Sequence, residues 1–509
     1  MSSLRLGLLP LDDRPCNLLF PRRIAQIAGV RLVVPPRRLL GRFTAPGDAE
    51  ALSDWLQRMA GEVEGLIVSA DMLAYGGLVA SRTGVVPERQ ALARINSLHR
   101  IRRAHPDLTI FCFSVIMRLG ITVDSEGAAL LHERIARWAQ LTDDVRRLRR
   151  EEYADELIRL EGLIPPRARS SYMRIRRRNH AANMWAVQLV SDGVIDYLVL
   201  AQEDAAARGL HKFEQQMLSD GMASLGVEGR VSLHPGTDEV AMVLLARYLC
   251  RQHGRSPAVL PLYPSRKAEA VIPLFEDRPL RETVTAQIQA AGGRVAAQRG
   301  EADLVLVVHA PLSKQREARD AGKHPTPARV VEAAVGHIKS ALRGKPVAVA
   351  DVAYCNGADP ALIQALQRER LFARLHAFAG WNTAGNSIGA AVAHGIARVF
   401  STPTHRSEIA HRLFLFERLL DDYAYQSIIR QQAISRAERL GLSPLNLGGK
   451  GRDLQRFVAR RAGPMARSLW RRNFPGDPPS LGVRLPWPRL FEAEIRCSLS
   501  REQRWPDRM

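Results

Sequence analysis

The stretch RLGLLPLDDRPCN, residues 5–17, is the first indication of the fold. The apolar run that ends at Leu11 is typical of a buried strand. It stops at two acids and an arginine, Asp12, Asp13 and Arg14, and Pro15 follows directly. The question is why a chain would place these charges where its first strand ends.

The same alternation of short apolar runs with helical patterns continues along the chain, as in parallel α/β proteins. Strands are predicted at 4–9, 30–34, 65–69, 108–115, 196–201, 230–233, 258–262, 304–308 and 346–350, and a shorter one ends near Ala379. Helices are predicted at 48–59, 87–101, 126–158, 181–191, 213–225, 238–251, 328–342 and 360–367.

About ten strands are too many for one eight-stranded barrel. We therefore predict two doubly wound, Rossmann-like parallel-sheet lobes, with a TIM-type barrel plus an extra lobe as the alternative. The predicted domains are 1–253, which carries most of the acidic strand ends, 254–402, a second α/β domain, and 403–509. The last combines helical patterns at 405–440 with Pro-rich stretches and an Arg-rich tail, and is predicted to be a helical cap.

Composition narrows the classes of function. The 509 residues are 46% hydrophobic and 25% charged, which is typical of a globular protein, and no apolar run is long enough to span a bilayer. We expect a cytoplasmic protein without a membrane partner. The five cysteines are scattered and form no CxxC pair, so neither a disulfide framework nor a thiolate zinc site is expected.

The net charge of +21 raises the alternative of nucleic-acid binding. Most arginines, however, stand in mixed runs such as DDVRRLRREEYADE (143–156), which are typical of solvated helix faces. Denser runs occur at 173–180 and 452–472, and either could form a basic patch. Because no known nucleic-acid-binding signature is present, we do not expect nucleic acid as the partner.

Polar residues beside Gly or Pro follow nearly every predicted strand. The motifs are PLDDRPCN (10–17), SADMLAYGGLVASR (69–82), SVIMRLG (114–120), AQEDAAARGLH (201–211), HPGTDEVA (234–241), ADVAYCNGAD (350–359) and AGWNTAGNSIG (379–389). In parallel sheets, ligands bind at the carboxyl ends of the strands. A single Asp after a strand is most often a helix cap, but so many charged endings on one edge indicate a site.

Carboxylates that share a partly buried site cannot all ionise, and this separates a proton donor from a base or nucleophile. Glycoside hydrolysis is the commonest chemistry that uses such a pair. We therefore predict a hydrolase acting on a carbohydrate, most simply a glycosidase, whose small-molecule or oligosaccharide substrate is unknown. The acid/base pair is expected among five residues: Asp12, Asp13, Asp71, Glu203 and Asp204.

Other strand-end residues are predicted to contact the substrate. Arginines would pair with carboxylates or with an anionic group, and aromatic rings would stack on a sugar. The predicted contacts are Arg14, Tyr75, Arg82, Arg118, His211, Asp238, Glu239, Asp351, Asn356, Trp381, Asn382 and Asn386.

Two alternatives remain open. The first is a metal-dependent hydrolase or isomerase, in which a divalent cation is held by the same acids with His211, His234 or His309. Otherwise no cofactor is expected, since neither GxGxxG nor GxxxxGK[ST] occurs. The second is a protein without enzymatic activity, in which the lobes would close on a ligand and so sense it.

As a set, the motifs PLDDRPCN, SADMLAYGGLVASR, QED…GLH, PGTDEVA, ADVAYCNGAD and AGWNTAGNSIG resemble a bacterial family known as domain of unknown function 4127. The resemblance spans roughly residues 4–420. It implies that the motifs form one functional unit, but it does not name a reaction.

Overall fold

The computed structural model describes residues 4–499, and the chain forms two units that interleave along the sequence. Unit 1 comprises the chain up to Asp13, Arg31–Ala241 and Phe275–Asp277. Unit 2 comprises Arg14–Val30, Met242–Leu274 and the chain from Arg278 onward. The boundaries predicted at residues 253 and 402 therefore do not coincide with the two units.

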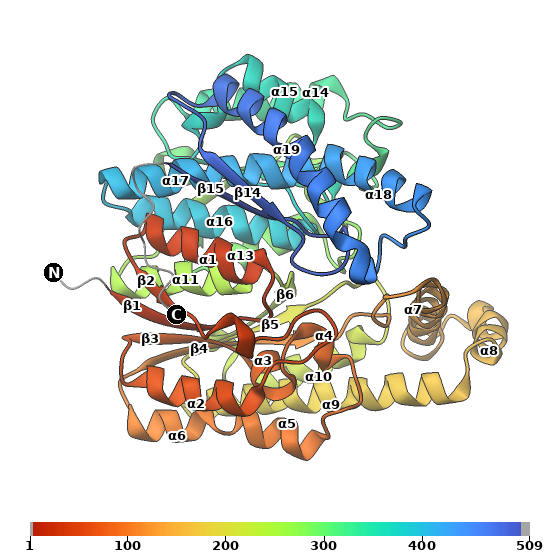
Figure 1. Ribbon diagram of the computed structural model, residues 1–509. Helices are drawn as coiled ribbons and strands as arrows, with labels where there is room; N and C mark the ends of the chain where they lie inside the picture. Colours follow the sequence, from red (N-terminus) through yellow and green to blue (C-terminus); the bar gives the residue numbers. More distant parts are fainter. Residues whose placement is uncertain (1–3, 500–509) are drawn as a thin grey trace. The chain divides into compact units, whose positions relative to one another are not determined.

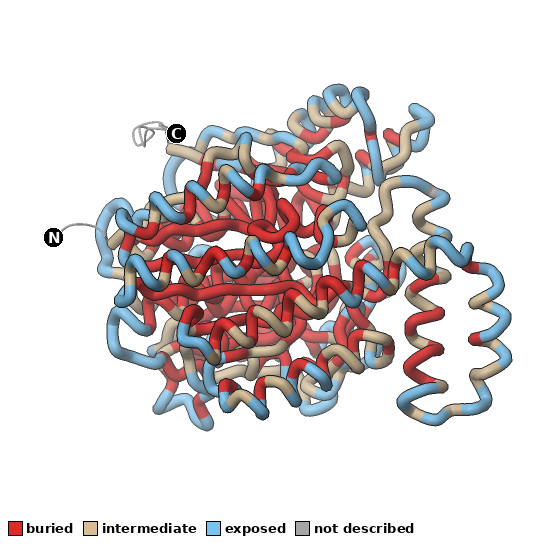
Figure 2. Tube along the Cα trace, turned by 90° about the horizontal axis from the view of Figure 1, so that it is seen from below, coloured by how far each residue is buried: buried red, intermediate tan, exposed pale blue. Residues whose placement is uncertain are grey.

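Unit 1 contains a parallel six-stranded sheet in the order β2-β1-β3-β4-β5-β6. Its strands are β1 Arg5–Leu9, β2 Arg31–Val33, β3 Gly65–Ser69, β4 Thr109–Ile116, β5 Tyr197–Gln202 and β6 Val231–Pro235. The central strands are buried along their whole length (Figure 2). The order 2-1-3-4-5 belongs to doubly wound folds, which bind ligands at the carboxyl ends of the strands where the winding reverses. Here that point lies between β1 and β3.

The helices of unit 1 connect these strands. They are α2 Ala49–Ala60, α3 Ala70–Tyr75, α4 Leu78–Ser81, α5 Glu88–Ile95, α6 Leu98–Ala104, α7 Glu126–Arg146, α8 Ala154–Gly162, α9 Pro166–Ser191 and α10 His211–Ser224. The long helix α9 packs against β4 and β5, while α2 packs against β1 (Figure 1). A separate small core between α7, α8 and α9 includes Trp138 and Tyr172, whose rings meet edge to face at 6.3 Å.

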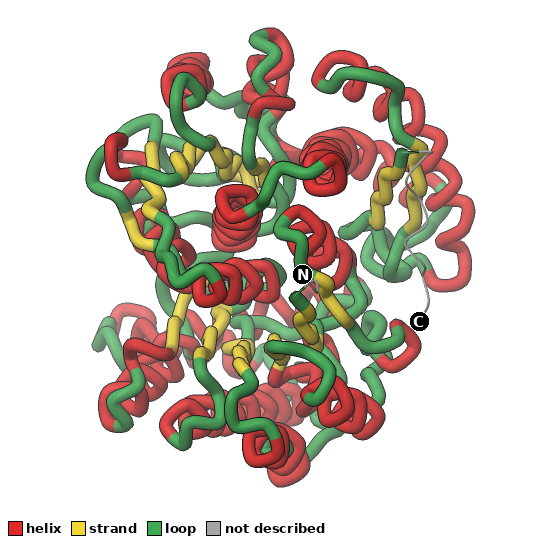
Figure 3. The backbone as a smooth tube through the Cα atoms, turned by 90° about the vertical axis from the view of Figure 1, so that its left-hand side faces the viewer, coloured by secondary structure: helices red, strands yellow, loops and turns green. Residues whose placement is uncertain are grey.

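Unit 2 contains a parallel five-stranded sheet in the order β13-β11-β9-β7-β8. Its strands are β7 Ala258–Leu262, β8 Arg294–Val295, β9 Leu304–His309, β11 Val347–Asp351 and β13 Ala377–Ala379. Counted along the chain within this unit, the spatial order is again 2-1-3-4-5. Figure 3 shows the strands of each sheet flanked by helices.

Helices of unit 2 pack in pairs against this sheet. α13 (Leu280–Ala290) packs against α16 (Ala384–Phe400), which covers β11 and β13, and α14 (Ala328–Ala341) packs against β9 and α15 (Pro360–Arg368). The remaining helices are α1 Pro15–Ile27, α11 Val240–Gln252, α12 Arg266–Glu269, α17 His405–Arg418, α18 Arg430–Arg439 and α19 Gly451–Asn473. All but the first two residues of α11 belong to unit 2. Two short strands, β10 Arg316–Glu317 and β12 Tyr354–Cys355, pair in parallel. Between α17 and α18 the chain forms an 11-residue π-helix, η7 Leu419–Ile429.

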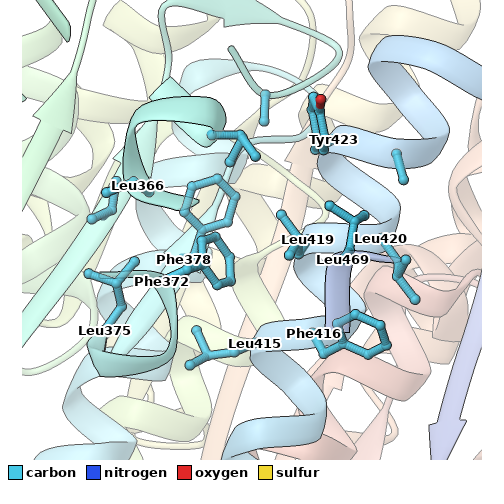
Figure 4. Packing of buried hydrophobic residues seen from close by; sticks show 14 of the residues in the cluster. Leu366, Phe372, Leu375, Phe378, Leu415, Phe416, Leu419, Leu420, Tyr423 and Leu469 are labelled. Carbon is cyan, nitrogen blue, oxygen red and sulfur yellow. The ribbon is translucent and has the colours of Figure 1, made fainter. Parts of the chain in front are cut away.

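The segment after residue 402 is part of the core of unit 2 rather than a separate cap. Phe372 and Phe378, the latter in β13, lie with ring centroids 5.1 Å apart (Figure 4). Phe416 of α17 meets Trp470 of α19 edge to face at 4.9 Å. Truncating one buried Phe of such a core to Ala costs about 3–5 kcal/mol. These helices are therefore needed for the stability of the sheet that precedes them.

The sequence predictions of fold class are confirmed: the protein is α/β with two parallel-sheet lobes and a helical C-terminal region. Every predicted strand is present, and the barrel alternative is wrong because both sheets are open. Among the elements that the sequence patterns missed are α1, α13, α19 and an antiparallel hairpin formed by β14 Ser480–Arg484 and β15 Glu494–Ser498. Prolines precede β14 and lie in the loop between the two strands, and α1 begins with Pro15 and contains Pro21, so proline obscured the patterns of the hairpin and of α1.

Among the helices of residues 4–499, none combines the length and apolar character that crossing a bilayer requires.

Candidate functional site

The carboxyl edge of the unit 1 sheet collects the charged residues that follow its strands. Going across the sheet from β1 to β6, the edge carries Asp12 and Asp13, Asp71, Arg118, Glu203 and Asp204, and then Asp238 and Glu239. All of these residues belong to unit 1. This edge is the candidate functional site.

Asp71 stands at the start of α3, directly after β3. The Ser69 hydroxyl caps this helix by accepting the Met72 N–H at 3.1 Å, and the Asp71 carboxylate accepts the Val115 N–H of β4 at 2.8 Å. Only 2% of Asp71 is exposed, and this burial raises its pKa to about 7; the Val115 N–H opposes the rise and the charge of Glu203 adds to it. Asp71 is therefore a carboxyl group that holds a proton up to about neutral pH.

Glu203 follows β5 and is held by arginines. Its Oε1 pairs with Arg82 from the end of α4 and lies 4.0 Å from Arg118 Nη1. Its Oε2 is buried, and no hydrogen bond to it is found among residues 4–499. One oxygen is thus paired while the other can accept a proton or a hydrogen bond.

Two residues of α9 hold the loop that carries Arg118 by hydrogen bonds to its carbonyl oxygens. Arg176 donates to the Met117 and Arg118 carbonyl oxygens at 3.0 and 2.8 Å, and the Tyr172 hydroxyl donates to Leu119 O at 2.7 Å. The charge of Arg176 is balanced by Glu214 at 2.7 Å. Sequence reasoning did not single out Arg176; the only signal was its place in the basic run at 173–180, which the structure shows to be partly buried.

Tyr75 does not offer an open ring for a sugar. The residue is 3% exposed, and the Arg178 guanidinium lies over its ring at 4.3 Å. Arg178 in turn donates to the Thr83 and Val86 carbonyl oxygens, both at 2.8 Å, so it anchors the loop after α4. Stacking of Tyr75 on a substrate stays a prediction, and in this structure the Arg178 guanidinium occupies the position over the ring.

His211 is also buried rather than presented to solvent. It lies 3.8 Å from Asp277, a carboxylate that Lys212 and Gln215 already engage at 2.8 and 2.7 Å. Burial lowers the pKa of His211 to about 3, with the charge of Asp277 opposing. The role of His211 as a substrate contact stays a prediction, and in this structure its imidazole is buried beside Asp277.

The other predicted acids of unit 1 differ in their surroundings. Asp13 pairs with Arg37, whose Nε lies 3.2 Å from its carboxylate, and Asp204 pairs with Arg118. Asp12 lies against the Gly77 turn, and the Glu239 carboxylate packs on Gly236, whose φ of 111° requires glycine. Asp12, Asp13, Asp238 and Glu239 are all buried.

Six predicted site residues belong to unit 2: Arg14, Asp351, Asn356, Trp381, Asn382 and Asn386. Arg14 is 4% exposed, lies 3.6 Å from Glu492 and stacks on Trp487 at 4.9 Å. The three charges of the DDR motif therefore belong to different units. The two acids follow the first strand of unit 1, whereas the arginine contacts the loop of the C-terminal hairpin in unit 2.

Asp351 ends β11 and pairs in register with His309 at the end of β9. It accepts the Asp359 N–H at 2.7 Å, and Asp359 is bonded to His309 Nε2 at 2.8 Å. Burial raises the pKa of Asp351 to about 7, with His309 opposing and Asp359 adding to the rise. The group is fully buried, so Asp351 belongs to an internal network that joins strand ends.

The match to protein families decides the identity of the chain. The model for the family described as "Protein of unknown function (DUF4127)" matches residues 6–496. This chain belongs to the DUF4127 family. The match extends past the motifs to the Pro-rich C-terminal segment, consistent with the place of that segment in the core of unit 2.

No curated protein matches the DUF4127 protein. Among solved structures it is similar to the carboxyl transferase domain of Rhizobium etli pyruvate carboxylase with 3-bromopyruvate, at 12% identity and a TM-score of 0.21, covering 92% of this chain and 57% of that one. The same domain without that compound matches at a TM-score of 0.20, with 12% identity and the same coverage. The chain thus spans little more than half the length of these structures.

Over residues 4–499, no group of three or more His, Cys, Asp and Glu side chains is arranged to hold a metal ion. A metal-dependent hydrolase or isomerase stays the alternative hypothesis from the sequence.

Proposed function

We propose that this DUF4127 protein is a hydrolase that cleaves a glycosidic bond at the carboxyl edge of the unit 1 sheet. Asp71 would donate the proton to the leaving group, and Glu203 would act as the carboxylate base or nucleophile. One observation carries the proposal: the charge of Glu203 contributes to raising the pKa of Asp71 to about 7, so two acids from different strand ends interact in one buried place.

Such a pair of carboxyl groups can act in general acid/base catalysis. A buried carboxylic acid that keeps its proton at neutral pH can serve as a general acid, and a carboxylate beside arginines can serve as its ionised counterpart. Arg82 and Arg118 would orient Glu203 and stabilise its charge. Glycoside hydrolysis uses this division of roles between two carboxyl groups, which supports the assignment of reaction class.

The leaving group offers a sharp test. Aryl glycosides are first assayed as a panel, and each active sugar is then compared with a 4-nitrophenyl and with a more acidic 2,4-dinitrophenyl leaving group. Asp71→Asn should lower kcat/KM by about 10²–10⁴ for the poorer leaving group and far less for the better one, because the latter departs without a proton. Glu203→Gln should lower both by a similar factor.

Asp54→Asn is the matched control, since Asp54 is an exposed acid on α2. Its turnover should equal that of the wild type. If Asp71→Asn and Glu203→Gln turn over like the wild type, or if both lose activity without regard to the leaving group, the assigned roles are wrong. Loss of wild-type turnover on chelation would favour the metal-dependent alternative.

A further inference from the structure

His132 of α7 lies beside the loop that follows β4 and carries Arg118. Its Nδ1 is 2.7 Å from the Ile121 carbonyl oxygen. Because a carbonyl oxygen can only accept, Nδ1 carries the proton and the second ring nitrogen, Nε2, keeps a lone pair. Within residues 4–499 no hydrogen bond to Nε2 is formed, and the side chain is partly exposed. The structure therefore holds one tautomer of this histidine in place.

The imidazole packs directly on Gly120, the last residue of the SVIMRLG motif (114–120). A Cβ atom at this position would clash with Nδ1 and Cε1 of the His132 ring. The glycine is thus required by the close approach of the histidine. Packing on Gly120 and the hydrogen bond to Ile121 together fix the position of the ring and the direction of its lone pair.

The loop beside His132 is connected to Glu203 through Arg82. Arg82 Nη1 donates to Thr122 Oγ1 at 3.3 Å, and the same guanidinium pairs with Glu203. Thr122 directly follows Ile121, which holds the imidazole. The histidine and the Arg82–Glu203 pair are thus bound by neighbouring residues of one loop.

At the other end of this loop, Arg118 and Asp204 form a part of the site that solvent reaches. Their side chains pair with each other and are 20% and 30% exposed, whereas the side chain of Glu203 is 8% exposed. His132 is also partly exposed. A substrate that enters from solvent would meet these outer side chains before it meets Glu203.

The surroundings of His132 favour its neutral form. Partial burial and the charge of Arg118 lower the pKa of His132, and the charge of Arg82 acts in the same direction. The hydrogen bond to Ile121 and the charge of Asp204 oppose these effects. A ring that resists protonation is a poor general base, but its lone pair can accept a hydrogen bond. The histidine is therefore suited to bind a hydroxyl group without taking its proton.

We propose that His132 is a substrate-contact residue, whose Nε2 accepts a hydrogen bond from one hydroxyl of the glycoside that binds at this edge. The inference rests on the proposed function, because the glycoside brings the hydroxyl. A hydroxyl that donates to Nε2 can at the same time accept from a neighbouring N–H. His132 would select sugars that carry this hydroxyl, because a sugar without it would leave the Nε2 lone pair of the complex without a donor.

Substrates that each lack one hydroxyl test the proposal. They are made from the most active 4-nitrophenyl glycoside and compared with that parent in the wild type and in His132→Phe, which keeps a flat ring on Gly120 but has no acceptor. At one position, loss of the hydroxyl should lower kcat/KM about threefold to tenfold more in the wild type than in the variant. At the other positions the two proteins should respond alike.

This comparison is independent of two complications. The change in intrinsic reactivity caused by removing a hydroxyl is the same for both proteins and cancels. Each ratio of analogue to parent is taken within one protein, so it does not depend on the fraction that folds. Gly120→Ala, which displaces the ring but keeps the histidine, should show the same selective loss as His132→Phe.

His99→Phe is the matched control. His99 of α6 is also a partly exposed histidine of unit 1, and it lies 3.8 Å from Asp192. It should treat every analogue like the wild type. The proposal is overturned if His132→Phe responds to every analogue as the wild type does, while the acid/base roles tested by the Asp71 and Glu203 variants would stand. If the wild type turns over no glycoside, the proposed function fails and the contact at His132 fails with it.

Discussion

The raised pKa of Asp71 predicts that unit 1 loses stability as the pH rises. An Asp in an unfolded chain titrates near 3.9, whereas burial places Asp71 at about 7. Folding thus disfavours the ionised form. The contribution of this group is fully present below about pH 4, declines between about pH 4 and 7, and does not change further at higher pH.

The magnitude follows from the pKa. A rise from 3.8 to about 7 corresponds to about 4 kcal/mol, at about 1.4 kcal/mol for each pH unit. Asp71→Asn replaces the acid by a neutral group of the same shape, whose Oδ1 can still accept the Val115 N–H. The variant should therefore match the wild type near pH 4 and exceed its free energy of unfolding by up to about 4 kcal/mol near pH 8.

The assay needs to follow unit 1 alone, because two units need not unfold together. Cys112 of β4 is fully buried and is the only cysteine of unit 1. Equilibrium urea unfolding, followed by a brief thiol-labelling pulse and peptide mass spectrometry of Cys112, gives the free energy at each pH. Asp54→Asn serves again as the control and should leave the pH dependence unchanged.

The comparison between variant and wild type removes the contributions of all other titrating groups. If the difference in unfolding free energy between Asp71→Asn and the wild type is the same at about pH 5 and about pH 8, Asp71 is not a buried acid with a raised pKa. The assignment of Asp71 as a proton donor would then lose its physical basis.

Three further predictions concern other contacts. Glu203→Gln removes a charge that raises the pKa of Asp71, so the pH-dependent loss of unit 1 stability should move to lower pH in the same Cys112 assay; an unmoved midpoint would mean that the two acids do not interact. Arg176→Leu leaves the partly buried Glu214 without its cation and releases the loop at Arg118, so it should destabilise unit 1 by about 3–5 kcal/mol in urea. Arg177 is neighbouring and exposed, so Arg177→Leu should change stability by less than about 0.5 kcal/mol. α19 exposes seven arginines, Arg452, Arg456, Arg460, Arg461, Arg467, Arg471 and Arg472, so duplex DNA should be retained at about 20 mM salt and released by about 200 mM; tight binding that persists at the higher salt would contradict our expectation that nucleic acid is not the partner.

Much of the candidate site could be predicted because parallel strands end on one edge of a sheet. The acids after the apolar runs at 5–9, 65–69 and 197–202 had to lie on that edge once the strands were known. The sequence could not show which partners each acid would have. Asp13 is as buried as Asp71 and Glu203, but its carboxylate pairs with Arg37, whereas Asp204 is only partly buried.

Supporting residues were harder to find than the acids. Arg176 and Arg178 belong to the arginine run at 173–180, which could have formed a basic patch. Both are buried instead and donate to carbonyl oxygens of loops. Tyr75 and Trp381 seemed suited to stacking on a sugar, but both are buried in the described structure. Periodicity shows which side chains share a face of a helix, and it does not show what that face contacts.

The sequence by itself determined the alternation of strands and helices, the parallel sheets and the polar strand ends, because these depend on local apolar patterns and on the geometry of a parallel sheet. Only the tertiary structure decided that the chain crosses between units within the DDR motif, that residues after 402 complete the core of unit 2, and which carboxyl groups are buried. A pKa depends on how many atoms exclude water from a group and on the charges nearby. Those atoms come from segments distant in sequence, so they are known only when the chain is folded.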